Sequence, residues 1–320
     1  MTKVPVAFIC DSHYVIPTAV AITSLICNKN PNTYYNIYII GADLSEMEIE
    51  KFYEFKGDEA DVHIIKTSLE KYEGMQKYGL LTSATYLKFD LPDLIPNQDK
   101  VLYLDSDIII QKDLSDLFEI NIKDYYAGAV KDIGLIHYNP NNKNHFNSGI
   151  MLLNLKLMSD NNASKALLDI GRSVENLTLM DQDCFNILFD KKVKFLQIIY
   201  NCHYYFFLKY RDEYTLDCIN KYFETNYSSW DNIKKDSCII HFVSYEKPWI
   251  YSDVTSVGEW DEYFKKSPYK HNKLKRKSIK LRELMVSRNL TKLLYFFFMH
   301  WRYHGFRFAM GKVRKKLSKK

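Results

Sequence analysis

Glycine and proline are scarce in this chain, at 11 and 8 of 320 residues, and no segment of it repeats. This scarcity, with a hydrophobic fraction of 47%, excludes collagen-like, low-complexity and disordered classes and predicts a globular protein. Glycine-rich phosphate loops are also missing, because no G-x-G-x-x-G follows the first predicted strand and no G-x-x-x-x-G-K-S/T occurs. A bound nucleotide would therefore need its phosphates neutralised in another way.

The cysteines lack any pairing pattern. None of the six forms a C-x-x-C pair or has zinc-ligand spacing, so we predict reduced thiols in the core of a cytoplasmic protein. The first 15 residues, MTKVPVAFICDSHYV, lack a cationic segment followed by a long apolar run. We therefore expect no signal peptide.

Acidic residues are nearly absent from the end of the chain. Residues 264–320 carry 19 Lys and Arg against one acid, Glu283, a net charge of +18, so that 1–263 carry −13 of the total +5. Charge blocks of this density bind an anionic partner or stay solvated. We therefore divide the chain into a catalytic domain, 1–255, and a basic, aromatic C-terminal region, 256–320.

Short apolar runs alternate with helical patterns along the body. This alternation predicts an α/β fold whose central, mostly parallel sheet is covered by helices on both faces. The predicted strands are Val4–Ile9, Tyr35–Ile40, Val62–Ile65, Val101–Leu104, 127–130, 149–155 and 238–242. The predicted helices are Pro17–Asn28, one with a capping box from Ser45, Ser83–Leu91, and one around Asp181–Phe189.

Two carboxylates, Asp105 and Asp107, interrupt the apolar run VLYLDSDIII (101–110). They follow a predicted strand, at the edge where ligands bind in such sheets. Side chains two residues apart in extended chain point to the same side, so the two carboxylates converge and repel unless a cation lies between them. Carboxylate oxygens suit Mg²⁺, Ca²⁺ or Mn²⁺. The alternative is a strand end with two solvated acids.

Three further segments carry polar residues at strand or helix ends. HFNSGIMLLN (145–154) runs from a polar turn into a buried strand, MDQD (180–183) opens a helix, and HFVSYEKPW (241–249) follows the apolar run CII. Each also has an ordinary structural interpretation: an acid favoured by the helix dipole, a structural histidine, or a solvated lysine.

In this order, however, VLYLDSD, FNSGIMLLN, DQD and H-x₅-KPW together resemble glycosyltransferase family 8, the retaining sugar-nucleotide transferases of the GT-A fold. The resemblance covers residues 4 to 250 and includes AFICDSHY and SATYLKFDLPDLIP. It implies a GT-A fold and transfer of galactose or glucose from a UDP-hexose donor. The implied acceptor is a saccharide or glycolipid, such as lipopolysaccharide or lipooligosaccharide.

The resemblance also implies roles for single residues. Asp105, Asp107 and His241 would hold Mn²⁺, with Mg²⁺ as the alternative. Lys247 would contact the diphosphate, Asp11 and Tyr14 the uracil and ribose, Asn147 and Asp181 the donor sugar, and Gln182 would lie beside the anomeric carbon. Lys88, Asp105, Ser106 and Ser148 complete the implied donor site. The chain departs from the family pattern at three positions, with Lys88 for a frequent Arg, Ser244 for Gly and His13 for Asn.

The predicted mechanism depends on Gln182, because an amide is a poor nucleophile. We expect same-face attack through an oxocarbenium-like state, with the leaving phosphate taking the acceptor's proton. Asp181 and Asp132 remain alternative nucleophiles for a double displacement. Two other classes are a self-glycosylating, glycogenin-like primer, for which the 25 tyrosines would be acceptors, and a non-catalytic sugar-nucleotide or membrane-binding protein.

Aromatic residues interleave with cations near the C-terminal end. The run LLYFFFM (293–299) has seven residues, against the ~20 needed to span a bilayer. We therefore predict a helical tail that lies on an anionic membrane, at the inner face of the cell membrane, with its aromatic residues in the headgroup zone. A basic helix packed on the acidic body is the alternative. No nucleic-acid recognition motif accompanies the charge, so we expect no nucleic-acid partner.

Overall fold

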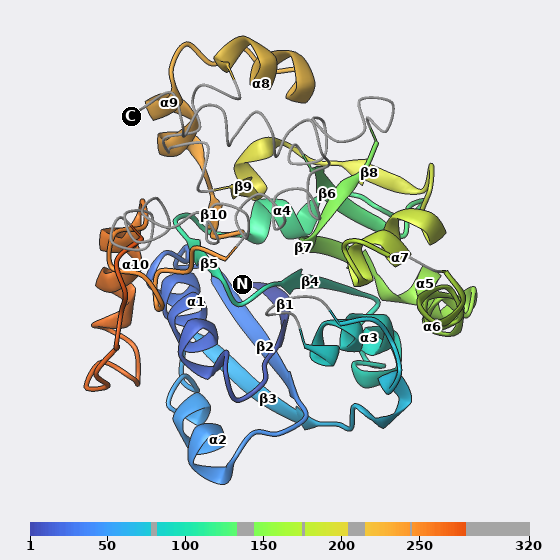
Figure 1. Ribbon diagram of the computed structural model, residues 1–320, viewed down its shortest axis with the longest axis horizontal. Helices are drawn as coiled ribbons and strands as arrows, with labels where there is room; N and C mark the ends of the chain where they lie inside the picture. Colours follow the sequence, from blue (N-terminus) through green and yellow to red (C-terminus); the bar gives the residue numbers. More distant parts are fainter. Residues whose placement is uncertain (78–81, 133–143, 175–176, 204–214, 244, 280–320) are drawn as a thin grey trace, which may run out of the picture.

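A computed structural model describes residues 1–77, 82–132, 144–174, 177–203, 215–243 and 245–279 (Figure 1). Its central element is a seven-stranded sheet of order β3-β2-β1-β4-β7-β6-β8. The strands are β1 (Thr2–Ile9), β2 (Thr33–Gly41), β3 (Ala60–Lys66), β4 (Lys100–Leu104), β6 (Ala127–Lys131), β7 (Phe146–Asn154) and β8 (Val193–Phe195). The six strands predicted before residue 156 are confirmed, whereas β8 was not predicted.

Four strands of this sheet, β3, β2, β1 and β4, run parallel to one another. β7 is antiparallel to both of its neighbours, β4 and β6, and β8 is parallel to β6. The carboxyl ends of β1 and β4 therefore meet the amino end of β7 at one edge of the sheet. This edge brings residues after Ile9 and Leu104 next to residues at the start of β7.

A second, three-stranded sheet was not predicted. It has the order β5-β10-β9 and consists of β5 (Ile108–Ile110), β10 (Ile239–His241) and β9 (Cys202–His203). The predicted strand at 238–242 is therefore right, but it pairs outside the central sheet. In the antiparallel β5–β10 ladder, His241 is opposite Ile108, the residue that follows Asp107.

Two apolar cores lie on the two faces of the central sheet, because alternate side chains of each strand point to opposite faces. Val4, Val6 and Phe8 of β1 face the core shared with α1, α10 and the second sheet. Ala7 and Ile9 face the core shared with η2, α6 and α7. Figure 1 shows α1 and α10 grouped beside the sheet, with α3, α5, α6 and α7 together at another side. The predicted coverage of both faces is confirmed.

The helices agree with the predictions where predictions were made. The capping box is present, since Ser45 and Glu48 bond reciprocally at the start of α2. The segment predicted from Ser83 is a 3₁₀ helix, and a short α-helix containing Pro92 continues it. The helical elements are α1 (Val15–Cys27), α2 (Glu46–Tyr53), η1 (Glu70–Tyr72), η2 (Ser83–Asp90), α3 (Leu91–Leu94), α4 (Ser115–Glu119), α5 (Leu155–Asp160), α6 (Ala163–Ser173), α7 (Asp181–Leu188), η4 (Ile198–Tyr200), α8 (Leu216–Phe223), α9 (Trp230–Asp236) and α10 (Val257–Phe264).

The first part of the basic region packs on the body. Trp260 of α10 is fully buried and stacks on Phe264, with ring centroids 5.4 Å apart. The guanidinium of Arg276 lies 5.3 Å from the Trp260 ring and pairs with Asp261. The predicted membrane-binding tail lies outside the described residues, and the predicted boundary at 255/256 stays a prediction. Among the residues described up to 279, we find no helix with the length and apolarity to cross a bilayer.

Candidate functional site

The D-x-D segment joins the two sheets at the edge where β1 and β4 end. Asp105 follows β4 directly, and its backbone N–H donates to the Gly149 carbonyl of β7 at 2.7 Å. Asp107 precedes β5, and its carbonyl accepts from the Phe242 N–H after β10 at 2.8 Å. The prediction that both carboxylates follow the carboxyl end of a central strand is therefore confirmed.

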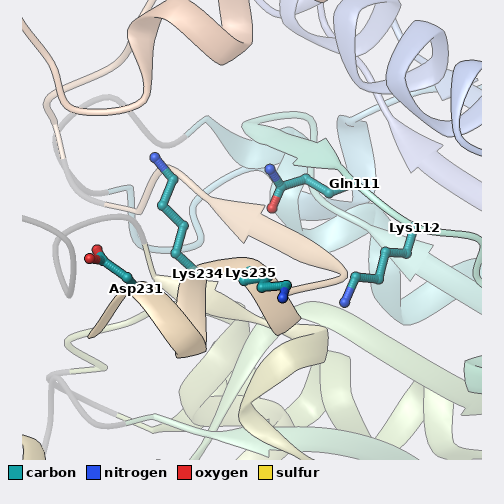
Figure 2. Close-up of a pocket in the computed structure, with 5 residues that line it drawn as sticks. All are labelled: Gln111, Lys112, Asp231, Lys234 and Lys235. Carbon is teal, nitrogen blue, oxygen red and sulfur yellow. The ribbon is translucent and has the colours of Figure 1, made fainter. Parts of the chain in front are cut away.

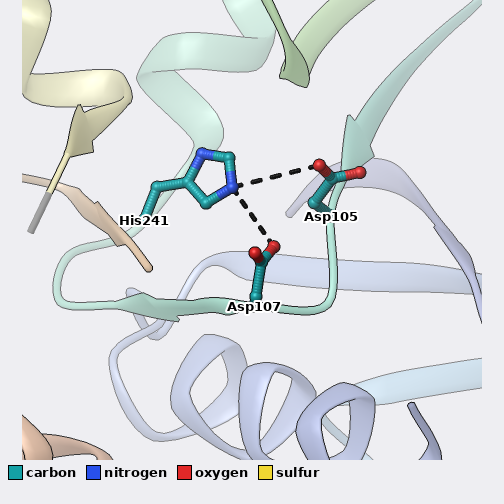
Figure 3. A group of neighbouring side chains, drawn as sticks. All are labelled: Asp105, Asp107 and His241. Carbon is teal, nitrogen blue, oxygen red and sulfur yellow. Dashed lines mark hydrogen bonds and ion pairs between the residues drawn. The ribbon is translucent and has the colours of Figure 1, made fainter. Parts of the chain in front are cut away.

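His241 completes a cluster with the two carboxylates (Figure 3). Its Nε2 lies 3.2 Å from Asp107 Oδ1 and 3.9 Å from Asp105 Oδ2. One ligand atom of each residue lies within 4.8 Å of the others, which allows one ion to bind all three. Two carboxylates and an imidazole form a donor set that suits a divalent metal ion.

Gly149 leaves the space that this cluster needs. A Cβ atom at position 149 would lie 2.4 Å from His241 Cε1 and 2.7 Å from Asp105 Oδ2. Both separations are below van der Waals contact, so any side chain there would push the imidazole and the carboxylate apart. The residues present therefore fit a divalent ion in their chemistry and in their packing.

Two buried lysines balance the carboxylates. Lys247 pairs with Asp107 Oδ2 and donates to the Phe242 carbonyl at 2.7 Å. Burial would raise the pKa of Asp107, but Lys247 and His241 outweigh it and hold that pKa well below its usual range. Lys88 Nζ lies 3.2 Å from Asp105 Oδ1. Burial nevertheless raises the Asp105 pKa, since Lys88 offsets only part of its effect.

Lys88 also links Asp105 to Asp181 at the start of α7, because it pairs with both. Its ammonium lies 2.8 Å from Asp181 Oδ2 and 4.8 Å from the centre of the Tyr103 ring. Burial acts to lower the Lys88 pKa, but the carboxylates of Asp105 and Asp181 outweigh it and raise that pKa. Lys88 therefore keeps its charge while only 3% exposed.

The residues predicted around the donor sugar lie together. Asp181 accepts from Lys88, from Thr85 Oγ1 at 2.7 Å and from Ser148 Oγ at 2.9 Å. Gln182 Oε1 accepts from Asn147 Nδ2 at 3.0 Å and from the Ser148 N–H at 3.2 Å.

The turn that leads into α7 orients these side chains. Gln182 Nε2 donates to Asp132 Oδ2 at 2.9 Å, which connects the helix to the end of β6. The preceding residue, Met180, has φ 51° and ψ −116°, a backbone conformation that L-residues rarely adopt. Its fully buried side chain anchors this turn, which turns Asp181 and Gln182 toward β7.

The residues predicted to contact the nucleoside lie after β1. Asp11 accepts from Thr82 Oγ1 at 2.9 Å and from the His13 N–H at 3.0 Å. Tyr14 contacts Trp249 edge to face, with ring centroids 5.6 Å apart. Their contacts with a nucleoside stay predictions, and His13 is exposed.

Ser106 differs from its neighbours in the D-x-D segment. Its hydroxyl accepts from Thr18 Oγ1 at 2.7 Å and donates to the Ile9 carbonyl at 3.3 Å. This side chain therefore bonds to α1 and β1, and its predicted contact with the donor stays a prediction. Ser244, a noted departure from the family pattern, lies outside the described residues.

Three residues that the sequence interpretation missed support the site. Tyr103 donates to Asp105 Oδ1 at 2.6 Å, and Thr85 donates to Asp181 as described above. Asn201 is 1% exposed and contacts His241 Nδ1 through Oδ1 at 2.9 Å. Two of these residues could have been found from the sequence. Tyr103 lies two residues before Asp105 in a strand and so points to the same side. Asn201 is a lone amide in the apolar run IIYNC.

A separate hollow of about 410 Å³ lies at the far end of β5 (Figure 2). Its lining residues come from that strand end and from α9: Gln111, Lys112, Asp231, Lys234 and Lys235. None of these residues belongs to the predicted site, so this hollow plays no part in the arrangement around Asp105.

Comparisons with known proteins agree with this geometry. The model of Glycosyl transferase family 8 matches residues 5–253. The glycosyltransferase GlyE of Streptococcus pneumoniae is 27% identical over 276 residues, which are 82% of this chain and 61% of GlyE. A lipopolysaccharide 1,2-glucosyltransferase of Escherichia coli is 24% identical over 287 residues, 82% of this chain and 80% of that protein.

Among solved structures, the galactosyltransferase LgtC in complex with donor and acceptor sugar analogues is similar in fold. It has a TM-score of 0.70 and 20% sequence identity over 87% of this chain and 99% of LgtC. This similarity confirms the predicted GT-A fold. The chain spans less than two thirds of the length of GlyE.

The fold and the site define a class, the GT-A proteins, with a D-x-D segment at the end of a central parallel strand. Within that class the chain belongs to glycosyltransferase family 8, because the family model covers most of its length. The resemblance inferred from the motifs is therefore confirmed.

The cluster predicts metal binding that depends on both carboxylates. Titration with Mn²⁺, followed by calorimetry, should give one site, and Asp105→Asn or Asp107→Asn should weaken it at least about tenfold, since each variant removes one anionic ligand. Asp190→Asn, which changes an exposed acid at the end of α7, should leave the affinity unchanged. Equal Mn²⁺ affinity in all four proteins would contradict the assignment.

Proposed function

We propose that this chain is a retaining glycosyltransferase that moves a hexose, galactose or glucose, from a UDP-sugar to a saccharide acceptor. The observation that carries the proposal is the cluster of Asp105, Asp107 and His241, with Lys88 and Lys247 in contact with its carboxylates. Membership of family 8 supports it, since the matched region contains all five residues.

The cluster and its lysines would receive the donor diphosphate. Asp105, Asp107 and His241 would hold Mn²⁺, or alternatively Mg²⁺, which when bound neutralises the leaving diphosphate as a Lewis acid. Lys247 would exchange its bond with Asp107 for a phosphate oxygen, because the ion then balances that carboxylate. This arrangement supplies the phosphate neutralisation that a chain without glycine-rich loops needs.

The hydrogen bonds of Asp181 and Gln182 favour same-face attack over a double displacement. Three donors occupy both oxygens of Asp181, which lowers its nucleophilicity. The orientation of the Gln182 amide is fixed from both ends. Its oxygen accepts from Asn147 Nδ2 and the Ser148 N–H, and its NH₂ group donates to Asp132. We infer that the departing phosphate takes the proton of the acceptor hydroxyl, while these residues orient the donor sugar.

The proposed acceptor is a lipopolysaccharide, a lipooligosaccharide or another cell-surface glycan. One of the relatives is a lipopolysaccharide glucosyltransferase, which supports this class of acceptor. We also propose that the chain acts at the inner face of the cell membrane, bound through its basic C-terminal tail.

The proposal is tested by a panel of UDP-sugars with Mn²⁺ in a thermal-shift assay. UDP-galactose or UDP-glucose should raise the melting temperature by several degrees, because a ligand that binds only the folded state stabilises it. Intact-mass measurement without acceptor distinguishes the glycogenin-like alternative, in which the chain gains mass in whole hexoses. A panel in which no UDP-sugar has any effect would contradict the proposed donor class.

Gln182 provides a test of the mechanism. Gln182→Ala should lower kcat by about one to three orders of magnitude, the range expected when an oriented polar group is lost. A loss of all activity would instead indicate a nucleophile at this position. Trapping a glycosyl adduct on Asp181 or Asp132 would replace same-face attack with a double displacement.

The membrane proposal requires a truncation that spares the core. Deletion of residues 280–320 keeps Trp260, Tyr269 and Arg276, whose burial and contacts tie 256–279 to the body. The truncated protein should stay in the supernatant with anionic phosphatidylserine vesicles, whereas the full chain sediments, and turnover on a short soluble acceptor should not change. If both proteins sediment equally, or neither does, the tail is not the membrane-binding element.

A further inference from the structure

We propose that Asn201 is a positioning residue that orients His241 toward the metal and couples this ligand to Gln182 through Asn147. The inference deepens the proposed function and rests on the metal site described above. Asn201 follows η4 and immediately precedes β9, whose His203 pairs with His241 in the β9–β10 ladder. At 1% exposure, its amide has no access to a substrate and can act only through its neighbours.

The side-chain amides of Gln182, Asn147 and Asn201 bond to one another in a row. Backbone N–H groups determine the direction of these hydrogen bonds, because an N–H can only donate. The Gly149 N–H donates to Asn147 Oδ1 at 3.0 Å, so this atom is the carbonyl oxygen of the side chain. Asn147 Nδ2 must then face Gln182 Oε1, at 3.0 Å. The Ser148 N–H donates to the same Gln182 oxygen, which confirms that orientation independently.

The orientation of Asn147 determines that of Asn201. Asn201 Nδ2 donates to Asn147 Oδ1 at 2.8 Å. A rotation of the Asn201 amide by half a turn would place two carbonyl oxygens against each other at that distance. Asn201 Oδ1 is therefore the atom that faces His241 Nδ1, at 2.9 Å.

A carbonyl oxygen accepts and cannot donate, so His241 Nδ1 carries the proton in this contact. In the neutral ring the lone pair then resides on Nε2, the atom that faces Asp105 and Asp107. A histidine that binds a metal needs this tautomer, and a partner on its other nitrogen commonly holds it. The Gly149 N–H thus selects, through Asn147 and Asn201, the nitrogen that His241 offers to the ion, and the Ser148 N–H supports the same choice through Gln182.

The same amide links the metal ligand to the donor-sugar end of the site. A shift of Asn201 moves His241 on one side and, through Asn147, Gln182 on the other. The two consequences can be separated by substitution. Asn201→Asp keeps an acceptor for His241 Nδ1–H but faces Asn147 Oδ1 with a second acceptor. Asn201→Ala removes both bonds.

The experiment combines direct Mn²⁺ binding with donor kinetics. Asn201→Ala should weaken Mn²⁺ binding about 10- to 100-fold, the range found when the partner of a ligating histidine is removed. Asn201→Asp should keep Mn²⁺ affinity near that of the unaltered chain but lower kcat, because it displaces Asn147, one of the three groups that hold Gln182. Asn28→Ala is the matched control, since Asn28 makes three hydrogen bonds outside the site, and it should leave Mn²⁺ affinity unchanged.

A measurement on the unaltered protein covers the case in which a variant fails to fold. With ¹⁵N-labelled histidine and no metal, the His241 resonance, assigned from a His241→Gln spectrum, should report a protonated Nδ1. A protonated Nε2 with a bare Nδ1, or Mn²⁺ binding by Asn201→Ala equal to that of the control, would overturn the proposal. If the unaltered chain binds no Mn²⁺, the proposed function fails, while the ¹⁵N spectrum still decides the orientation of Asn201.

Discussion

Asp105 and Asp107 place two carboxylates in one cluster, with Asp105 partly exposed and Asp107 buried, and their mutual repulsion determines which residues can surround them. Each carboxylate has its own lysine, Lys88 for Asp105 and Lys247 for Asp107, and shares His241 with the other. Like charges at this separation are tolerated only where cations or a metal balance them. The buried lysines are thus required by the same charges that favour an ion, and under the proposed function they would also receive a phosphate.

Lys88 has a second consequence for the site. An arginine would form a planar fork with fixed directions, whereas an ammonium is a compact charge that can bond to groups on several sides. Here the ammonium reaches Asp105, Asp181 and the Ser148 carbonyl, at 3.2, 2.8 and 3.4 Å. One lysine therefore connects the D-x-D segment, α7 and β7, so a single charge links the proposed metal ligands to the residues proposed to hold the donor sugar.

Six of the seven central strands and the grouping of the polar residues around Asp105 could be predicted from the sequence, because apolar runs and the polar residues that end them are local signals. The antiparallel direction of β7 and the second sheet could not be predicted, since both depend on pairing between distant segments, such as Ile108 with His241. Asn201 was missed for the same reason. Its role exists only when β7 and β10 bring Asn147 and His241 to either side of one amide.

The site lies where the two sheets join, so some of its residues are held by the central sheet and others by the second sheet. Asp105, Asp181 and Gln182 are held by the central sheet and α7, whereas His241 follows the second sheet through β10. Asp107 lies on the link between the two, with its carbonyl bonded to the residue after β10. A displacement of the second sheet would therefore separate His241 from Asp105 while leaving the donor-sugar residues in place. Under the proposed function, metal affinity would then depend on the docking of β10 against β5, and the orientation of the donor sugar mainly on the packing of α7 against β7.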